Sequence, residues 1–173
     1  MIAHPPCTYL CSSGLHWNTR VPGRDRKTRE AMLFVLNLMG VGFVHNPIPR
    51  IALENPIGRI TLGYRAPDQV IQPWQFGHDA SKATCLWFKE LPLLRPTKFV
   101  DARYSCECGT IFRIGLGSSL CPNCLGEEKF RPIWDNQTKS GQNKLGASPN
   151  RAKERAKTYR GIAAAMAAQW GTV

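Results

Sequence analysis

Apolar and polar positions along the first hundred residues follow patterns that predict strands and one long helix. A short apolar start, 1–3, precedes a Pro-Pro turn. The segment 24–39 opens with charged residues, continues through the apolar run 31–36 and ends before Gly40, which is a typical helix stop. Because the second half of this segment is apolar on most sides, we expect the helix to be buried against a sheet.

Three later apolar runs predict further strands. Residues 50–53 predict a short buried strand that a turn at 54–56 ends, and the runs 69–72 and 84–88 alternate or cluster as strands do. A strand, a buried helix and a second strand in succession predict a parallel α/β sheet. The Ala-rich run 161–170 predicts a C-terminal helix on propensity alone.

The chain divides into three zones by composition. Residues 1–100 hold the apolar runs, residues 101–132 contain two close pairs of cysteines, and residues 133–173 are first polar, then basic, and end in the Ala-rich helix. We therefore predict an α/β domain that a small cysteine-rich insert interrupts, with the C-terminal helix packing back on the α/β domain.

Composition narrows the function classes. Of the 173 residues, 43% are hydrophobic, which excludes disorder over the whole chain. The best apolar stretch, 31–44, is interrupted by Asn37 and two glycines and is shorter than the roughly 20 residues that a membrane span needs. The first residues lack the basic and apolar regions of a signal peptide, so we expect a cytoplasmic protein without a membrane partner.

The charge is strongly positive. Lysine and arginine together number 23, aspartate and glutamate 12, and the formal net charge is +11. A surplus of this size favours a polyanionic partner, above all nucleic acid, although a soluble basic surface explains the charge equally well.

The seven cysteines indicate a metal site rather than disulfides. An odd total without a secretory signal argues against a disulfide framework. Two close pairs can converge on one tetrahedral zinc ion, and the four thiolate ligands would be Cys106, Cys108, Cys121 and Cys124. Four protein ligands leave no open position, so such a zinc ribbon would be structural and would supply the stability that a small insert lacks. The alternative is four free thiols.

Two polar motifs follow the first two predicted strands. A Pro-Pro-Cys motif places the nucleophilic thiol of Cys7 after the first strand, and a Glu-Asn pair places the carboxylate of Glu54 after the next. A right-handed crossover through the helix 24–39 would bring Cys7 and Glu54 to the same edge of the sheet. Taken singly, the motifs are also compatible with a structural cysteine near a turn and with an ordinary surface turn.

These two motifs resemble those of the cytosine-C5 DNA methyltransferases, in which a Pro-Pro-Cys loop supplies the nucleophile and a Glu-Asn pair supplies the base-binding carboxylate. The chain is more similar to a phage and prophage branch of that family, through stretches at 2–10, 67–78 and 159–163. The resemblance covers roughly residues 1–100 and 133–173 and leaves the cysteine-rich part as an insertion. It implies a partial Rossmann-like methyltransferase sheet with an inserted zinc ribbon.

The resemblance also implies a mechanism and a set of site residues. Cys7 would add to C6 of a cytosine that has left the duplex, while Glu54 holds N3 and the exocyclic amine, so that C5 takes the methyl group of S-adenosylmethionine. The residues that we assign to substrate binding are Pro5, Pro6, Asn55, Arg59, Arg65, Gln72 and His78. The implied partner is DNA, and the implied setting is the cytoplasm of a bacterium whose phage or prophage encodes the protein.

The chain departs from the family pattern in several places. Thr8 stands where a glutamine usually follows the Pro-Pro-Cys motif, Pro56 stands where valine usually follows the Glu-Asn pair, and the usual Gln-x-Arg-x-Arg strand is missing. The Gly-rich cofactor-binding turn of this fold is not found either. The chain therefore resembles the C-terminal half of a methyltransferase, either a truncated reading frame or one subunit of a split enzyme whose separate partner chain supplies the cofactor site.

Two alternatives stay open. In the first, the protein is a non-enzymatic zinc-ribbon protein that binds DNA through its basic surface. In the second, it is an amino-methyltransferase that uses the Pro-Pro turn for chemistry at an exocyclic nitrogen, and Cys7 has no part in the reaction.

Overall fold

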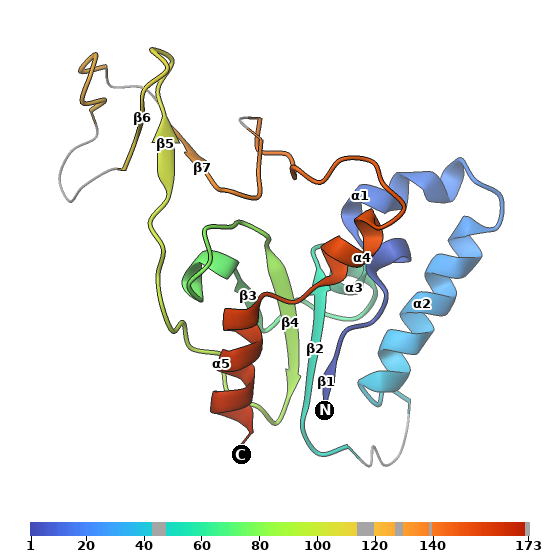
Figure 1. Ribbon diagram of the computed structural model, residues 1–173. Coiled ribbons are helices and arrows are strands. Elements are labelled where there is room, and N and C mark those ends of the chain that lie inside the picture. The colour runs from blue at the N-terminus through green and yellow to red at the C-terminus, as the bar shows by residue number, and fades with distance from the viewer. Residues whose placement is uncertain (43–47, 114–119, 127–129, 139, 172–173) are drawn as a thin grey trace. The chain divides into compact units, whose positions relative to one another are not determined.

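The computed structural model describes residues 1–42, 48–113, 120–126, 130–138 and 140–171 (Figure 1). The chain forms two compact units. The first unit comprises Met1–Ile71, Ala83–Leu94 and Ala168–Val173, and the second comprises Gln72–Lys82 and Arg95–Ala167. Among the described residues, no helix has both the length and the apolar character that crossing a bilayer requires.

A four-stranded sheet forms the centre of the first unit. Its strands lie in the order β1-β2-β4-β3 (Figure 1), and they are β1 (Ile2–Ala3), β2 (Ile51–Pro56), β3 (Gln69–Ile71) and β4 (Thr84–Lys89). β1 pairs with β2 in parallel, whereas β4 runs antiparallel to both of its neighbours. The predicted strands are confirmed, but the prediction of a parallel sheet is correct only for the β1–β2 pair.

The connections between strands explain this mixture. A parallel neighbour needs a crossover of a dozen or more residues, usually through an α-helix. Between β1 and β2 the chain contains α2 (Arg24–Leu38), which provides such a crossover. The connection from β3 to β4 contains only a short 3-10 helix, η3 (Pro73–Gln75). The architecture is therefore mixed α/β with a small mixed sheet.

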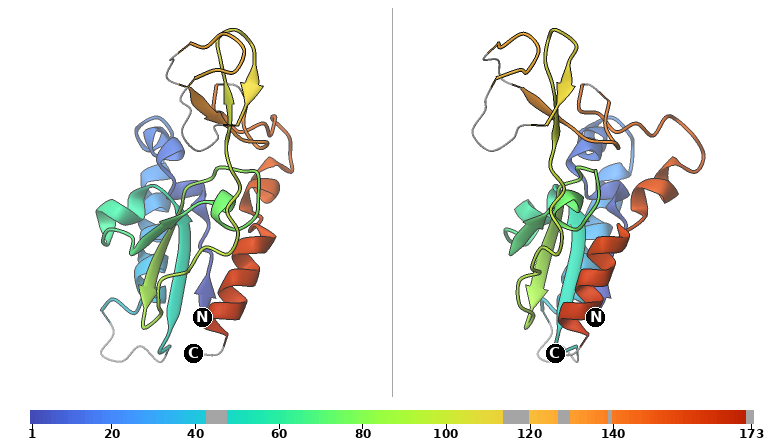
Figure 2. Two further views of the ribbon diagram at one scale, coloured as in Figure 1. Left: turned by 90° about the vertical axis from the view of Figure 1, so that its left-hand side faces the viewer. Right: turned by 60° about the vertical axis from the view of Figure 1, so that its left-hand side comes forward.

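The long helix α2 packs against this sheet through one face (Figure 1, Figure 2). Its buried residues, Thr28, Met32 and Val35, form a stripe at helical spacing. On the same helix the side chain of Leu33 is 59% exposed and that of Phe34 is 49% exposed. The predicted helix 24–39 and its burial against a sheet are thus confirmed, and the sheet covers only one of its faces.

Short helices complete the first unit. Between β1 and α2 the chain forms a 3-10 helix, a single α-helical turn and a second 3-10 helix, which are η1 (Cys7–Tyr9), α1 (Ser12–Leu15) and η2 (His16–Thr19). After β2 the chain forms α3 (Arg59–Gly63). The core between these elements includes the fully buried Leu10, Ile60 and Trp87.

The strand β2 is longer than the sequence predicts. The segment expected to be a turn continues the strand, and its residues Glu54, Asn55 and Pro56 pair with Leu86, Cys85 and Thr84 of β4. The turn prediction is therefore wrong. Pairing with β4 outweighs the local turn preference of Asn and Pro, and Pro56 occupies the last position of the strand, where a missing N–H costs least.

The second unit contains a small antiparallel sheet (Figure 2). Its central strand β5 (Arg103–Ser105) lies between β6 (Ile111–Phe112) and β7 (Arg131–Ile133). Aromatic rings pack beside it: the ring of Trp74 stacks on Trp134 with the centroids 6.0 Å apart and meets Phe99 at 5.9 Å. Of these rings, that of Trp134 is buried, whereas that of Phe99 is 63% exposed.

Two helices end the chain, α4 (Arg151–Ala156) and α5 (Arg160–Trp170), and α5 confirms the predicted C-terminal helix. Its last residues belong to the first unit. There the indole N–H of Trp170 donates to the carbonyl oxygen of Pro92 at 3.0 Å, and the Trp170 ring meets Phe88 of β4 edge-on at 5.3 Å. The end of α5 is thus held by the strand β4 and the segment that follows it.

Candidate functional site

The Pro-Pro-Cys motif follows the end of β1, and the Glu-Asn pair lies beside that end within the longer parallel strand β2. The parallel register pairs Ala3 with Leu53, so the residues that follow them, His4 and Glu54, lie opposite each other. Nδ1 of His4 and Oε2 of Glu54 are 2.9 Å apart. The two motifs are therefore joined directly, through a residue that precedes the first motif.

Asn55 makes a second link between the motifs. Its side chain is almost completely buried, and its Nδ2 donates to the carbonyl oxygen of Pro5 at 2.8 Å. Its Oδ1 is buried and has no hydrogen-bond partner among the described residues. A buried amide oxygen without a donor is costly, so Asn55 both anchors the Pro-Pro turn and leaves an acceptor unused beside it.

The backbone at Cys7 is held firmly. Pro6 has φ −55°, and the carbonyl oxygen of Cys7 accepts from the amides of Leu10 at 3.0 Å and Cys11 at 2.9 Å. The Cys7 side chain is half-buried at the start of η1. A proline-fixed turn closed by two hydrogen bonds leaves the thiol little freedom of position, which suits a reactive group.

Glu54 itself lies in a partly enclosed environment. Its side chain is 17% exposed, compared with 42% for His4. Burial raises the pKa of the neighbouring Cys85 thiol, and the charge of Glu54 raises it further. Cys85 is therefore a buried, unreactive thiol beside the strand-end acid, whereas Cys7 follows the turn.

An apolar hollow of about 520 Å³ adjoins the Pro-Pro turn on the side of α2. It is lined by Pro5, Pro6, Tyr9, Leu10, Lys27, Glu30, Ala31 and Phe34. The exposed ring of Phe34 belongs to this hollow. Pro5 and Pro6 thus contribute to an apolar surface, while the polar groups of the two motifs meet at the strand ends.

In the first unit, Arg65, one of the predicted substrate-binding residues, makes side-chain contacts within the fold, and Arg59 makes a backbone contact. Arg65 donates to Asp68 at 2.7 Å and to the carbonyl oxygen of Phe88 at 2.9 Å, so it braces the segment before β3 against β4. The hydrogen bond to Asp68 raises the pKa of Arg65 above its ordinary value. The amide of Arg59 donates to the carbonyl oxygen of Leu10 at 2.7 Å and starts α3.

In the second unit, Gln72 and His78 also make structural contacts. Oε1 of Gln72 accepts from the amide of Lys82 at 2.9 Å, and the amide of Gln72 donates to Oε1 of Gln75 at 2.7 Å, which caps η3. Nε2 of His78 accepts from the amide of Gly161 at 2.8 Å. These contacts hold one side-chain atom of each residue within the second unit.

The four predicted metal ligands converge on one point in the second unit. The sulfur atoms of Cys106, Cys108, Cys121 and Cys124 all lie within 4.8 Å of one another. The Sγ atoms of Cys106 and Cys124 are 3.4 Å apart, and those of Cys108 and Cys121 are 3.7 Å apart. Four sulfurs at about 2.3 Å from a tetrahedral zinc ion would be about 3.8 Å apart, so the cluster is compatible with structural zinc.

The backbone of the first cysteine pair forms a tight knuckle. The amide of Gly109 donates to the carbonyl oxygen of Cys106 at 2.9 Å, and the amide of Cys106 donates to the carbonyl oxygen of Thr110 at 3.0 Å. Gly109 has φ +87°, a conformation that glycine adopts without strain. The knuckle turns the sulfurs of Cys106 and Cys108 toward the second pair.

Hydrogen bonding at the knuckle also favours the ligating form of one thiol. The Thr110 hydroxyl, 3.3 Å from Sγ of Cys108, and the Thr110 backbone together lower the pKa of Cys108 to about 6. A thiolate, rather than a thiol, is the form that binds zinc. The donor set is four sulfurs, so a bound zinc ion would have no open position and no catalytic role.

Sequence reasoning missed His4. Its signal is the parallel register itself: the residue after Ala3 must lie opposite the residue after Leu53, on the same face of the sheet. That register follows from strand pairing and is not visible in the motif. No protein-family model, no curated protein and no solved structure matches this chain, so the site rests on its own geometry.

Proposed function

We propose that the end of the β1–β2 pair is a cytosine-binding site, in which Cys7 adds to C6 of a flipped base in DNA as in a DNA cytosine-C5 methyltransferase. The observation that carries this proposal is the pair of links between the two motifs. His4 contacts Glu54 at 2.9 Å, and Asn55 holds the Pro5 carbonyl oxygen at 2.8 Å. A thiol that follows the end of β1 and a carboxylic acid on the adjacent strand β2 can act as a nucleophile and acid pair.

The chemistry requires both groups. The thiolate sulfur of Cys7 forms a bond to C6, and the electron pair of the C5–C6 double bond shifts toward C5 and N3. Protonated Glu54 donates to N3 and stabilises the charge that develops there. C5 becomes nucleophilic and takes an electrophile. Loss of the C5 proton and expulsion of the thiolate then restore the double bond and free Cys7.

The methyl donor in this proposal is S-adenosylmethionine, which supplies the electrophilic methyl group when it is bound. Among the described residues, no Gly-rich turn between a strand and a helix that would hold it is found. We therefore assign its binding to polypeptide other than these residues. The groups described here bind the base, hold the N3 proton and supply the nucleophile.

Hydrogen exchange at C5 tests the proposal without the methyl donor. Addition of Cys7 to C6 lets C5 take a proton from water, so elimination releases the original hydrogen. The protein is incubated with DNA that carries tritium at C5 of an unpaired cytosine, because an unpaired base needs no flipping energy. We expect tritium release with the wild-type chain, its loss in Cys7→Ser and its retention in Cys11→Ser. Cys11 is the matched control, a half-buried thiol on the same turn.

A non-enzymatic DNA-binding protein is the second candidate, and the geometry of the four-cysteine cluster favours it. A unit stabilised by zinc, on a chain of net charge +11, can bind DNA without catalysing a reaction. DNA retention with no tritium release, unchanged in Cys7→Ser, would support this candidate and contradict the enzymatic one.

A further inference from the structure

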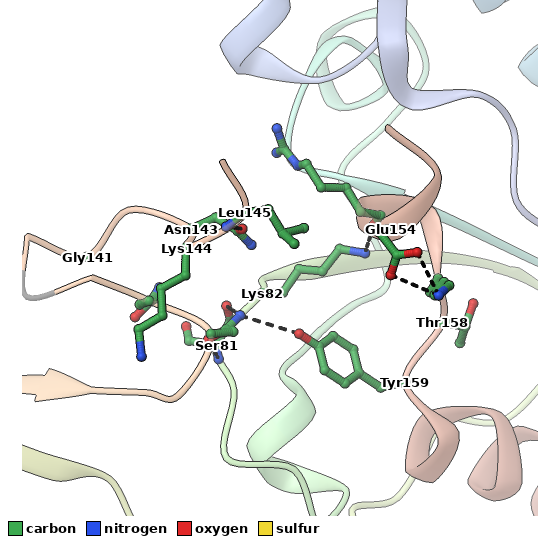
Figure 3. Close-up of a pocket in the computed structure, with 13 residues that line it drawn as sticks. Ser81, Lys82, Gly141, Asn143, Lys144, Leu145, Glu154, Thr158 and Tyr159 are labelled. Atoms are coloured by element: carbon green, nitrogen blue, oxygen red, sulfur yellow. Dashed lines mark hydrogen bonds and ion pairs between the residues drawn. The ribbon is translucent and has the colours of Figure 1, made fainter. Parts of the chain in front are cut away.

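A polar cavity lies within the second unit, among three segments that are distant in sequence (Figure 3). Its volume is about 530 Å³, a size in the range of small-molecule binding sites. The lining residues come from 81–82, 136–145 and 154–159. The strand-end site of the first unit contributes none of them.

The floor of this cavity is a connected set of polar groups. Oδ1 of Asn136 accepts from the amide of Ser81 at 3.0 Å, and its Nδ2 donates to the Ser81 carbonyl oxygen at 2.8 Å and to the Tyr159 hydroxyl at 3.3 Å (Figure 3). The three residues are half-buried. These contacts use both Nδ2 hydrogens of Asn136, whereas the Tyr159 hydroxyl can still donate to a ligand in the same space.

Tyr159 also contacts His78 through its ring. Its ring meets that of His78 with the centroids 5.1 Å apart, and His78 accepts from the amide of Gly161. Burial raises the pKa of Tyr159, so the phenol stays protonated and can donate. The cavity therefore contains a rigid aromatic ring with a hydroxyl donor.

The lining carries a positive charge. It includes four cationic residues and a single acid, Glu154. That acid is paired with Lys157, whose Nζ lies 2.8 Å from both carboxylate oxygens. The cations of the lining, which include Lys82, Lys144 and Arg155, thus outnumber the acid, and Nζ of Lys82 donates to the Arg155 carbonyl oxygen at 3.0 Å.

We propose that this cavity binds a nucleotide unit of DNA, with the lysines on the phosphate and the Asn136–Tyr159 floor on the base or sugar. Surplus cations bind phosphate oxygens. Amide side chains read base edges, and an aromatic ring gives a base a surface on which to pack. The choice of DNA rests on the proposed function, whereas the phosphate and nucleotide chemistry rests on the cavity.

An acidic peptide is the competing ligand for a basic surface. The cavity favours a nucleotide, because a carboxylate needs only the cations, whereas the amides of Asn136, Gln137 and Asn143 and the phenol of Tyr159 add donors and acceptors at one depth. The chain as a whole carries +11, which suits a polyanion with regularly spaced charges.

The test is the salt dependence of binding to a fluorescent twelve-nucleotide single-stranded DNA. The full chain is compared with Lys82→Ala/Lys144→Ala, with Lys144→Glu and with Lys153→Ala as the matched control. Lys153 is an exposed lysine of α4 that does not line the cavity. We expect the double variant to bind about tenfold or more weakly and to lose about 1.4 from the slope of log K against log salt, since each phosphate contact with single-stranded DNA contributes about 0.7. Lys144→Glu changes only an exposed side chain, so it is expected to fold. The same binding measurement on this variant tests the inference if the double variant does not fold.

Competition experiments identify the source of the phosphate. If dCMP displaces the labelled DNA from the wild-type chain, the cavity accepts a single nucleotide, and if only longer DNA competes, it holds backbone phosphates of the polymer. Unchanged affinity and slope in both lysine variants would overturn the inference. Displacement by a poly-glutamate peptide as effective as that by DNA would overturn it in favour of an acidic peptide.

The outcome is separable from that of the proposed function. Cys7→Ser is expected to bind the labelled DNA as tightly as the wild-type chain, because Cys7 belongs to the other unit. Loss of DNA binding in the lysine variants therefore supports the cavity even if tritium release fails. If tritium release persists and the lysine variants bind DNA as tightly as the wild-type chain, the inference about the cavity is refuted and the proposed function is not.

Discussion

His4 and Glu54 lie fifty positions apart in the sequence, and Nδ1 of the histidine is 2.9 Å from Oε2 of the acid. The contact joins the residue before the Pro-Pro-Cys motif to the acid of the Glu-Asn pair. It orients one carboxylate oxygen toward His4 and leaves the other for a ligand at the strand ends. In the proposed function His4 is thus a positioning residue for Glu54.

Replacement of His4 by alanine tests this role. We expect tritium release from C5 to fall between about tenfold and a hundredfold in His4→Ala, because a displaced acid no longer meets N3. His4→Asn should restore part of the rate, since its amide N–H lies close to the position of Nδ1. Binding of DNA should not change in either variant.

His16→Ala is the control for this experiment, since His16 is an exposed histidine on η2. The fold is expected to tolerate His4→Ala, because His4 is 42% exposed and a pair with one solvent-exposed member contributes little to the free energy of unfolding. Equal release by His4→Ala and the wild-type chain would contradict the positioning role.

Replacement of Asn55 tests how the Pro-Pro turn is anchored. Asn55→Ala removes the hydrogen bond to the Pro5 carbonyl oxygen and leaves that acceptor unpaired. We expect the free energy of unfolding to fall by about 1–3 kcal/mol, measured by urea denaturation. Asn37→Ala, at an exposed position on α2, serves as the control and should change it by no more than about 0.5 kcal/mol. A loss in Asn55→Ala as small as that of the control would show that the turn is held by other contacts.

The Arg65–Asp68 pair predicts a pH dependence of stability. The hydrogen bond from Arg65, and then that from the Phe88 amide, lowers the pKa of Asp68 below its ordinary value of 3.8. A lowered pKa in the folded state means that the carboxylate stabilises the fold above pH 3.8 and that this contribution is lost as the pH falls through the folded-state pKa. Asp68→Asn should therefore destabilise the protein at pH 7 by about 1 kcal/mol, since the pair is one-third exposed.

Denaturant titrations of Asp68→Asn and the wild-type chain at about pH 7 and about pH 3 provide the measurement. The difference should shrink at the lower pH, because below 3.8 the unfolded chain gains a proton that the folded carboxylate, with its lowered pKa, resists. An equal difference at both pH values would mean that the substitution acts through packing and not through the charge of Asp68.

Metal analysis tests the four-cysteine cluster. Reduced, purified protein should contain about one zinc ion per chain, and Cys108→Ser should lose most of it, because three thiolates bind zinc more weakly than four. Removal of zinc with a chelator should also increase proteolysis of the segment that carries the cluster. Cys11→Ser should keep its zinc, since Cys11 lies outside the cluster. Protein with no zinc and unchanged proteolysis would leave four free thiols as the explanation.

The sequence predicted the elements with local signals. Charged residues before an apolar run and a glycine after it located α2, alanines located α5, and apolar runs located all four strands of the first unit. The spacing of the cysteines also predicted their convergence, because a knuckle is a local structure of a few residues. In each case the residues that determine the feature are close together in the chain.

Only the tertiary structure decided the direction of β4, the extension of β2 through Pro56 and the exposure of Phe34. The same holds for the contact between His4 and Glu54 and for the cavity beside Tyr159. Each of these depends on which strand or segment pairs with another across many intervening residues. Turn and helix preferences describe a residue and its near neighbours, whereas pairing across the sheet adds hydrogen bonds and buried area that override them.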